Sequence, residues 1–144
     1  MRTLATVMML ALGASAASGE VRTKVVEYKQ GNTALEGFLA WDDAVKGPRP
    51  GVLVVHEWTG LGRYVKSRAE QLAKLGYVAF CADIYGKGVR PATPEEAAKT
   101  AAIYKNDRAL TRARVNAALD VLRANPLVDQ KRIAAIGYCF GGMV

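Results

Sequence analysis

Residues Ile133–Gly142 read IAAIGYCFGG, a short apolar run that ends in Gly-x-Cys-x-Gly and a further glycine. This pattern is typical of a nucleophile elbow, in which a buried strand turns sharply into a helix and exposes one side chain. The glycines around Cys139 remove Cβ atoms that would clash in so tight a turn. The first N–H groups of the following helix would favour a thiolate and an oxyanion beside it. The motif predicts that Cys139 is a nucleophile, although a glycine-rich turn around a buried structural thiol would show the same spacing.

The chain before this motif has the order of elements that such an elbow requires. Two apolar runs, Gly51–His56 and Tyr77–Ala82, have the composition of strands buried on both faces of a parallel sheet. Between them, Tyr64–Leu75 has apolar residues at helical spacing and ends before Gly76. A strand, a helix and a strand in this order form a right-handed unit with parallel strands. With Arg132–Gly137 as the third parallel strand, the sequence predicts an α/β fold.

An antiparallel hairpin is expected ahead of the parallel strands. Val21–Tyr28 and Leu35–Trp41 alternate loosely between apolar and polar residues, and Gly31-Asn32 between them is a turn signal.

Two further helices are expected between the second and third parallel strands. The first begins at Thr93, with Pro94 at its first position and Glu96 placed to complete a capping box. The second extends from about Asp107 to Ala124. Its predicted core face consists of Val115, Ala118, Leu119 and Leu122.

Length and composition restrict the class of protein. With 144 residues, 51% hydrophobic and 23% charged, the chain is expected to form one globular domain. The net charge is +7, but the basic residues are scattered and are not interleaved with aromatic residues, which argues against a nucleic-acid-binding protein. The sequence has no Cys-x-x-Cys pair, metal-ligand cluster or phosphate-binding loop. We therefore expect neither a metal nor a cofactor.

Residues 1–19 have the pattern of a secretory signal peptide. Arg2 precedes the apolar run Leu4–Leu12, and Ala14-Ser15-Ala16 offers a cleavage site between small residues. The run is too short to span a bilayer stably, so no membrane span is expected in the mature chain. The sequence predicts export, most plausibly to the periplasm; a misassigned start codon or a lipid-facing anchor is the alternative. Export raises the question of a disulfide, but we predict that Cys81 is a buried small hydrophobic residue and that Cys139 is a free thiol.

Three segments and the leading hairpin together resemble the dienelactone hydrolase family, a branch of the α/β-hydrolase fold. The segments are His56-Glu57-Trp58 after the first parallel strand, Cys81-Ala82-Asp83-Ile84-Tyr85 at the second, and Gly137–Gly142 at the elbow. The resemblance extends from about Lys24 to the last residue. It implies a hydrolase of small esters or lactones that acts through a cysteine nucleophile and an acyl-enzyme, without a cofactor.

The resemblance also implies roles for individual residues. Cys139 matches the nucleophile, and Glu57 matches a carboxylate that contacts the resting cysteine and takes part in its conversion to thiolate. A carboxylate beside a partly buried thiol favours the protonated form until the carboxylate is drawn away. The backbone N–H groups of Phe140 and Trp58 match the donors of the oxyanion hole.

Substrate-binding residues are expected in the loop after the second parallel strand, at Tyr85, Lys87 and Arg90. The family has an arginine at about the position of Lys87. Since a lysine holds a carboxylate only as a point charge, whereas an arginine binds it in a bidentate manner, the expected substrates are broader than the family name. His56 is the only histidine. It is not expected to be the catalytic base, because the base of such enzymes follows the nucleophile in the chain.

In α/β-hydrolases the acid and the histidine of the triad come after the nucleophile, and here the sequence reaches Val144 soon after Cys139. The resemblance therefore implies that residues 20–144 form the N-terminal part of such a domain. We expect little turnover from this part, because acylation of the thiol would be weak and deacylation would stall. We also expect the third parallel strand to have an apolar edge that no other strand pairs with. A non-catalytic exported binding module or remnant, and a redox-active thiol protein, are alternatives. The substrate and the oligomeric state are left open.

Overall fold

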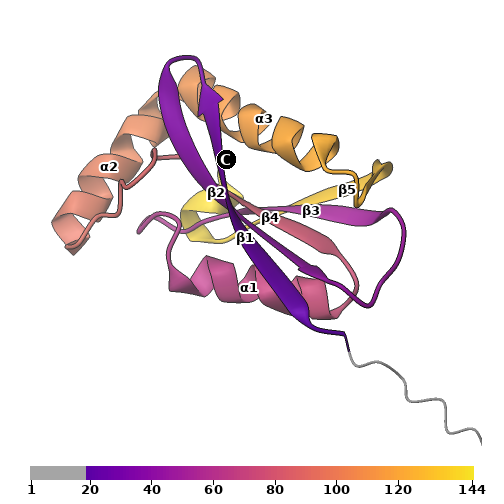
Figure 1. Cartoon of the computed structure of the whole chain (residues 1–144). Coiled ribbons are helices and arrows are strands. Elements are labelled where there is room, and N and C mark those ends of the chain that lie inside the picture. Colours follow the sequence, from indigo (N-terminus) through magenta and orange to yellow (C-terminus); the bar gives the residue numbers. More distant parts are fainter. Residues whose placement is uncertain (1–18) are drawn as a thin grey trace, which may run out of the picture.

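The computed structural model describes residues 19–144. The predicted signal peptide lies outside the described residues, except for Gly19. Figure 1 shows the arrangement of strands and helices. Within the described part of the chain, none of the helices combines the length and the apolar character needed to cross a bilayer.

One five-stranded sheet runs through the molecule, with the strand order β1-β2-β4-β3-β5. The strands are β1 (Val21–Gln30), β2 (Thr33–Asp42), β3 (Arg49–Val55), β4 (Val78–Ala82) and β5 (Val128–Gly137). β1 and β2 form the predicted antiparallel hairpin, and β2 pairs antiparallel with β4. β3 is central among the parallel strands, because β4 and β5 pair with it on either side. The predicted α/β fold is confirmed.

Helices cover both faces of the sheet. α1 (Arg63–Lys74) lies on one face, and α2 (Pro94–Asn106) and α3 (Arg108–Ala124) lie on the other (Figure 1). Alternate residues of β3 belong to two different apolar clusters: Val54 packs in the cluster that contains α1, and Leu53 packs in the cluster that contains α3. The continuous apolar composition of β3 thus reflects burial on both faces.

The ends of α1 and α2 follow local sequence signals. Gly76, which follows α1, has a φ of +90°, a conformation that glycine adopts without steric cost. The Thr93 side chain accepts a hydrogen bond from the Glu96 N–H at 3.2 Å and so caps α2 as predicted. The Glu96 carboxylate accepts from the N–H of Ala92 at 2.8 Å, so the predicted capping box reaches one residue further back than expected.

The buried face of α3 matches the predicted one at Ala118 and Leu122, and Val115 and Leu119 pack against the same core at its margin. Thr111, Arg114, Ala118 and Leu122 are buried, whereas Val115 and Leu119 are only partly buried. Val115 and Leu119 also line an open groove beside β5. The difference arises because β5 is the edge strand of the described sheet, so this flank of α3 has fewer neighbours.

β5 leaves an apolar edge exposed, as the sequence predicted. Ala134, Ala135 and Ile136 are exposed, and within residues 19–144 only β3 pairs with this strand. Such an edge is a template for pairing with another chain.

Candidate active site

Cys139 occupies a strained and exposed position immediately after β5. Its φ is +54°, and among residues 19–144 it is the only non-glycine residue with a positive φ. The side chain is exposed, and Cys139–Gly142 form a single 3-10 turn. Strain of this kind persists only where the surroundings enforce it, and it is concentrated at functional sites.

The glycines of the motif are required by close backbone approach. A Cβ at Gly137 would collide with the carbonyl of Gly141, and a Cβ at Gly141 would collide with the carbonyls of Val55 and His56. The Gly-x-Cys-x-Gly spacing is thus explained by the packing of the elbow against the end of β3.

The parallel strands deliver all the predicted catalytic residues to one edge of the sheet. Val55 is in register with Ala82 of β4 and with Gly137 of β5, so the segments that follow these three strands are neighbours. In open α/β sheets, this carboxyl edge is where ligands bind.

Glu57 lies two residues after the end of β3 and is partly buried. Its Oε2 atom is buried and has no hydrogen-bond partner within the described residues. The hydrogen bonds of residues 19–144 include none between Glu57 and Cys139, so the predicted contact is not seen in this structure and the role of Glu57 stays a prediction. Burial of a carboxylate oxygen without a hydrogen-bond donor costs free energy, so such oxygens are rare in folded proteins.

The two predicted oxyanion-hole donors have free N–H groups. Within residues 19–144, neither the backbone N–H of Trp58 nor that of Phe140 donates a hydrogen bond to another protein group. The Trp58 side chain is 37% exposed, whereas the Phe140 side chain is buried. An oxyanion hole needs N–H groups that no protein acceptor occupies, so the role of these two groups as its donors stays a prediction.

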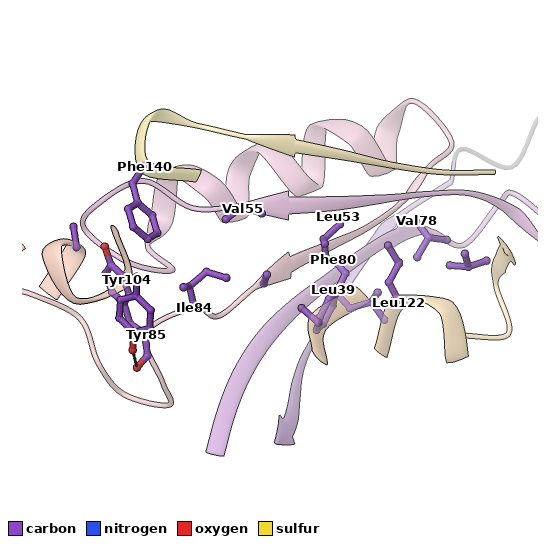
Figure 2. Close-up of a cluster of buried hydrophobic side chains, with 14 residues drawn as sticks. Leu39, Leu53, Val55, Val78, Phe80, Ile84, Tyr85, Tyr104, Leu122 and Phe140 are labelled. Atoms are coloured by element: carbon purple, nitrogen blue, oxygen red, sulfur yellow. Dashed lines mark hydrogen bonds between the residues drawn. The ribbon is translucent and has the colours of Figure 1, made fainter. Parts of the chain in front are cut away.

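Tyr85 is buried, and its hydroxyl is engaged by a protein group. It is 4% exposed, and its hydroxyl donates a hydrogen bond to the carbonyl of Trp58 at 2.9 Å. Figure 2 shows Tyr85, Tyr104 and Phe140 together at one end of the buried cluster that contains α3. Tyr104 donates a hydrogen bond from its hydroxyl to the carbonyl of Tyr85 at 2.9 Å. Burial raises the pKa of Tyr85, so the hydroxyl keeps its proton.

His56 is completely buried, and both of its ring nitrogens are engaged. Nδ1 lies 2.6 Å from the carbonyl oxygen of Glu57, and Nε2 lies 3.3 Å from the backbone nitrogen of Ile84. Since a carbonyl can only accept, Nδ1 carries the hydrogen and Nε2 accepts from Ile84. Burial lowers the pKa of His56 to about 4, so the ring is neutral near pH 7.

The other two predicted substrate-binding residues are held by protein groups. The Lys87 ammonium forms an exposed ion pair with Glu27 of β1, at 2.5 Å. The Arg90 side chain donates to the carbonyl of Leu61 at 2.9 Å and lies 3.7 Å from Asp83. Tyr85 thus contacts the elbow through Phe140, whereas the Lys87 ammonium pairs with the β-hairpin and the Arg90 guanidinium contacts two loops. Their roles in substrate binding stay predictions.

Asp83 belongs to the segment Cys81–Tyr85 that carries the family resemblance, but no role was predicted for it. It follows β4, is fully buried, and accepts hydrogen bonds from the N–H groups of Glu36 and Gly86, each at 3.0 Å. The hydroxyl of Tyr28 accepts from the N–H of Asp83 at 3.0 Å. These hydrogen bonds of Asp83 hold the hairpin and the loop after β4 against the carboxyl edge of the sheet. An acidic residue directly after a buried strand was the available signal.

The two cysteines differ in environment, as the sequence predicted. Both are free; Cys81 is fully buried and Cys139 is exposed. Burial raises the pKa of the Cys81 thiol, which is therefore inert. Within residues 19–144, no three His, Cys, Asp or Glu side chains are grouped to hold a metal ion.

Comparisons with known proteins identify the family and the fold of the chain. The sequence profile of the dienelactone hydrolase family matches residues 35–144. The chain is similar to the solved structure of m3DLH, with 42% identity and a TM-score of 0.82 over 85% of this chain and 51% of that chain. It is also similar to a dienelactone hydrolase-like promiscuous phosphotriesterase from metagenomic libraries, with 43% identity and a TM-score of 0.81 over 85% of this chain and 51% of that chain.

Among curated relatives, Protein usf of Aquifex pyrophilus is 29% identical over 123 residues, which are 83% of this chain and 52% of the relative. The chain spans about half the length of the first curated relatives that it matches. The profile match covers most of the described sheet and the whole of the elbow. The chain therefore belongs to the dienelactone hydrolase family of α/β-hydrolases.

Proposed function

We propose that this protein hydrolyses small esters or lactones through Cys139. The observation that carries the proposal is the conformation of Cys139: an exposed thiol at a φ of +54°, between glycines that admit no side chain, at the carboxyl edge of a parallel sheet. Membership of a hydrolase family supports the same reaction class.

In the proposed reaction, Cys139 Sγ attacks the carbonyl carbon and the carbonyl oxygen becomes an oxyanion. The N–H groups of Trp58 and Phe140 are proposed to stabilise that charge. The carbon–oxygen bond to the leaving alcohol then breaks, and a thioester is left on Cys139. Water hydrolyses the thioester in a second step. Glu57 is proposed to control the protonation of the thiol, because its unpartnered carboxylate oxygen lies at the same sheet edge.

Acylation is proposed to be faster than deacylation in the 144-residue chain. The sequence has one histidine, and the structure engages both nitrogens of that ring inside the protein. His56 is thus poorly placed to activate water, whereas a thiol is nucleophilic without help. We propose that the acyl-enzyme accumulates.

The test is treatment of the protein with p-nitrophenyl acetate, followed by intact-mass measurement. We expect one acetyl group per chain, on Cys139, and its loss in Cys139→Ser. Cys81→Ala is the matched control, which should acetylate like the unaltered protein because Cys81 is buried. Equal labelling of Cys139→Ser and the unaltered protein would refute the proposal.

A second substrate class is favoured by one of the comparisons. A relative of known structure at 43% identity is described as a promiscuous phosphotriesterase. A phosphotriester also develops negative charge on an oxygen when it is attacked, and the same N–H groups would stabilise it. We propose to test a p-nitrophenyl phosphotriester beside the ester; phosphorylation of Cys139, detected by mass, would support this class.

Export to the periplasm is proposed from residues 1–19, which have a basic start, an apolar run and a small-residue cleavage site. Fractionation of cells that express the protein tests it, with the N-terminus of the recovered chain determined by mass. Recovery of uncleaved protein from the cytoplasm would contradict the proposal.

A further inference from the structure

The peptide between Glu57 and Trp58 is held by its carbonyl. The carbonyl oxygen of Glu57 accepts from His56 Nδ1 at 2.6 Å and from the N–H of Gly60 at 3.1 Å. The described chain has no cis peptide bonds. In a trans peptide the C=O and N–H bonds point in opposite directions. The Trp58 N–H is therefore directed away from the His56 ring.

His56 is itself fixed by three neighbours. Its Nε2 accepts from the N–H of Ile84, which belongs to the segment after β4. Its ring is stacked on the ring of Phe140, with a centroid distance of 5.8 Å and an interplanar angle of 13°. The Tyr85 ring meets it edge-on at 4.7 Å. The ring thus joins the segments that follow β3, β4 and β5.

Tyr85 holds the next peptide of the same loop. Its hydroxyl donates to the carbonyl of Trp58, and its ring packs against Phe140 with a centroid distance of 5.4 Å. Tyr104 of α2 donates to the carbonyl of Tyr85, and its ring stacks on the Tyr85 ring with a centroid distance of 5.1 Å, so α2 supports the Tyr85 side chain as well. Tyr85 therefore contacts both residues that carry the free N–H groups.

We propose that His56 and Tyr85 are positioning residues that hold the N–H groups of Trp58 and Phe140 as a preformed oxyanion hole. This inference rests on the proposed function of Cys139. Neither side chain contacts the reacting atoms; both act through the backbone of Trp58 and the ring of Phe140. Donors fixed in advance cost no reorganisation when the oxyanion forms. Without these contacts, the Glu57–Trp58 peptide would be able to rotate and withdraw its N–H.

Two reactions of Cys139 distinguish the positioning of the oxyanion-hole N–H groups from a change in the reactivity of the thiol itself. In acetylation by p-nitrophenyl acetate, Sγ bonds to the carbonyl carbon, p-nitrophenolate leaves and the thiol proton passes to water; an oxyanion forms on the way. In alkylation by iodoacetamide, Sγ displaces iodide from a saturated carbon, and no oxyanion forms. A variant that lowers the acetylation rate but not the alkylation rate therefore affects a feature that acetylation alone requires, as the oxyanion hole is.

Tyr85→Phe removes the hydrogen bond to Trp58 and keeps the ring. We expect its acetylation rate to fall about 10-fold, less than the loss of a whole donor, while alkylation stays within about twofold. Tyr77→Phe is the matched control. It removes a tyrosine hydroxyl at the amino end of β4, remote from the elbow, and should leave both rates unchanged.

His56 is tested by a pair of variants. His56→Asn can place an amide N–H near the position of Nδ1, whereas His56→Leu fills similar space without a donor. We expect His56→Asn to retain more of the acetylation rate than His56→Leu, with alkylation equal in the two. Because His56 is fully buried, each variant is first checked by thermal unfolding, and Tyr85→Phe decides the matter if the His56 variants do not fold.

The outcomes are distinct. An unchanged ratio of the acetylation rate to the alkylation rate in a folded Tyr85→Phe protein would overturn the inference, and so would an equal fall of both rates, because the side chain would then act on the thiol. If the unaltered protein is alkylated at Cys139 but never acetylated, the proposed function itself fails, and the positioning role fails with it.

Discussion

The carbonyl oxygen of Val55 accepts a hydrogen bond from the backbone N–H of Tyr138 at 3.2 Å. This bond extends the pairing of β3 and β5 by one residue, directly before Cys139. It brings the elbow so close to β3 that Gly141 packs against the carbonyl of Val55. The fit between these two backbones is tight, so the elbow has no room for an added side-chain atom at Gly141.

Gly141→Ala should destabilise the protein by about 2 kcal/mol or more, because the new Cβ would overlap the carbonyls of Val55 and His56. Urea unfolding followed by circular dichroism measures the change. Gly62→Ala is the control. Its Cβ would come no closer than 3.8 Å to a neighbouring atom, so we expect a change within about 0.5 kcal/mol. Equal stability of the two variants would contradict the described packing.

Cys139→Gly should be more stable than Cys139→Ala by about 1 kcal/mol, because glycine adopts a φ of +54° without the strain that a Cβ brings. Both variants lose the nucleophile, so the comparison isolates the backbone. The same unfolding assay measures it. If Cys139→Ala were the more stable of the two, the strained conformation would be wrong.

Acid should destabilise the protein through His56. Burial lowers its pKa to about 4 from the ordinary value of 6.5. Between these values the unfolded chain binds a proton that the folded chain does not, so stability is full above pH 6.5 and falls as the pH drops towards 4. The loss approaches about 3 kcal/mol. The free energy of unfolding, measured from pH 7 to pH 4, should fall less steeply for His56→Asn; parallel curves would argue against a buried neutral ring.

Glu57→Gln should stabilise the protein by about 1 kcal/mol, because the buried Oε2 lacks a donor and a neutral amide is easier to bury than a carboxylate. It should also speed the alkylation of Cys139 if the Glu57 charge disfavours the thiolate. Glu70→Gln, a partly exposed glutamate on α1, is the control and should change neither quantity. A loss of stability in Glu57→Gln would indicate that the carboxylate has a partner.

Local signals explain what the sequence predicted well. The Gly31-Asn32 turn, the β-branched run of β3 and the glycines at the elbow each act within a few residues, and the hairpin, the parallel strands and the strained Cys139 follow from them. The resemblance to a known family added Trp58 and Phe140, whose N–H groups the structure leaves free.

The side-chain partners of Tyr85 and Asp83 could not be predicted from the sequence, because these contacts join residues far apart in the chain. The Tyr85 hydroxyl reaches a carbonyl 27 residues away, and Asp83 accepts from an N–H 47 residues away. A tyrosine in a loop after a strand looks like a substrate contact until its partner is known. The face of α3 was predicted only in part for a related reason: periodicity identifies apolar positions, but how completely each of them is covered depends on the strands beneath the helix.

The burial of Cys81 has a practical consequence for experiments on this protein. The sequence has two cysteines, and Cys81 is sealed between α1 and the sheet, with its thiol against the carbonyl of Val65. A thiol-reactive fluorophore added to the native protein should therefore label Cys139 alone. Its emission would report on ligand binding at the elbow without any engineered cysteine. The rate at which Cys81 becomes labelled would measure how often the protein unfolds locally around α1.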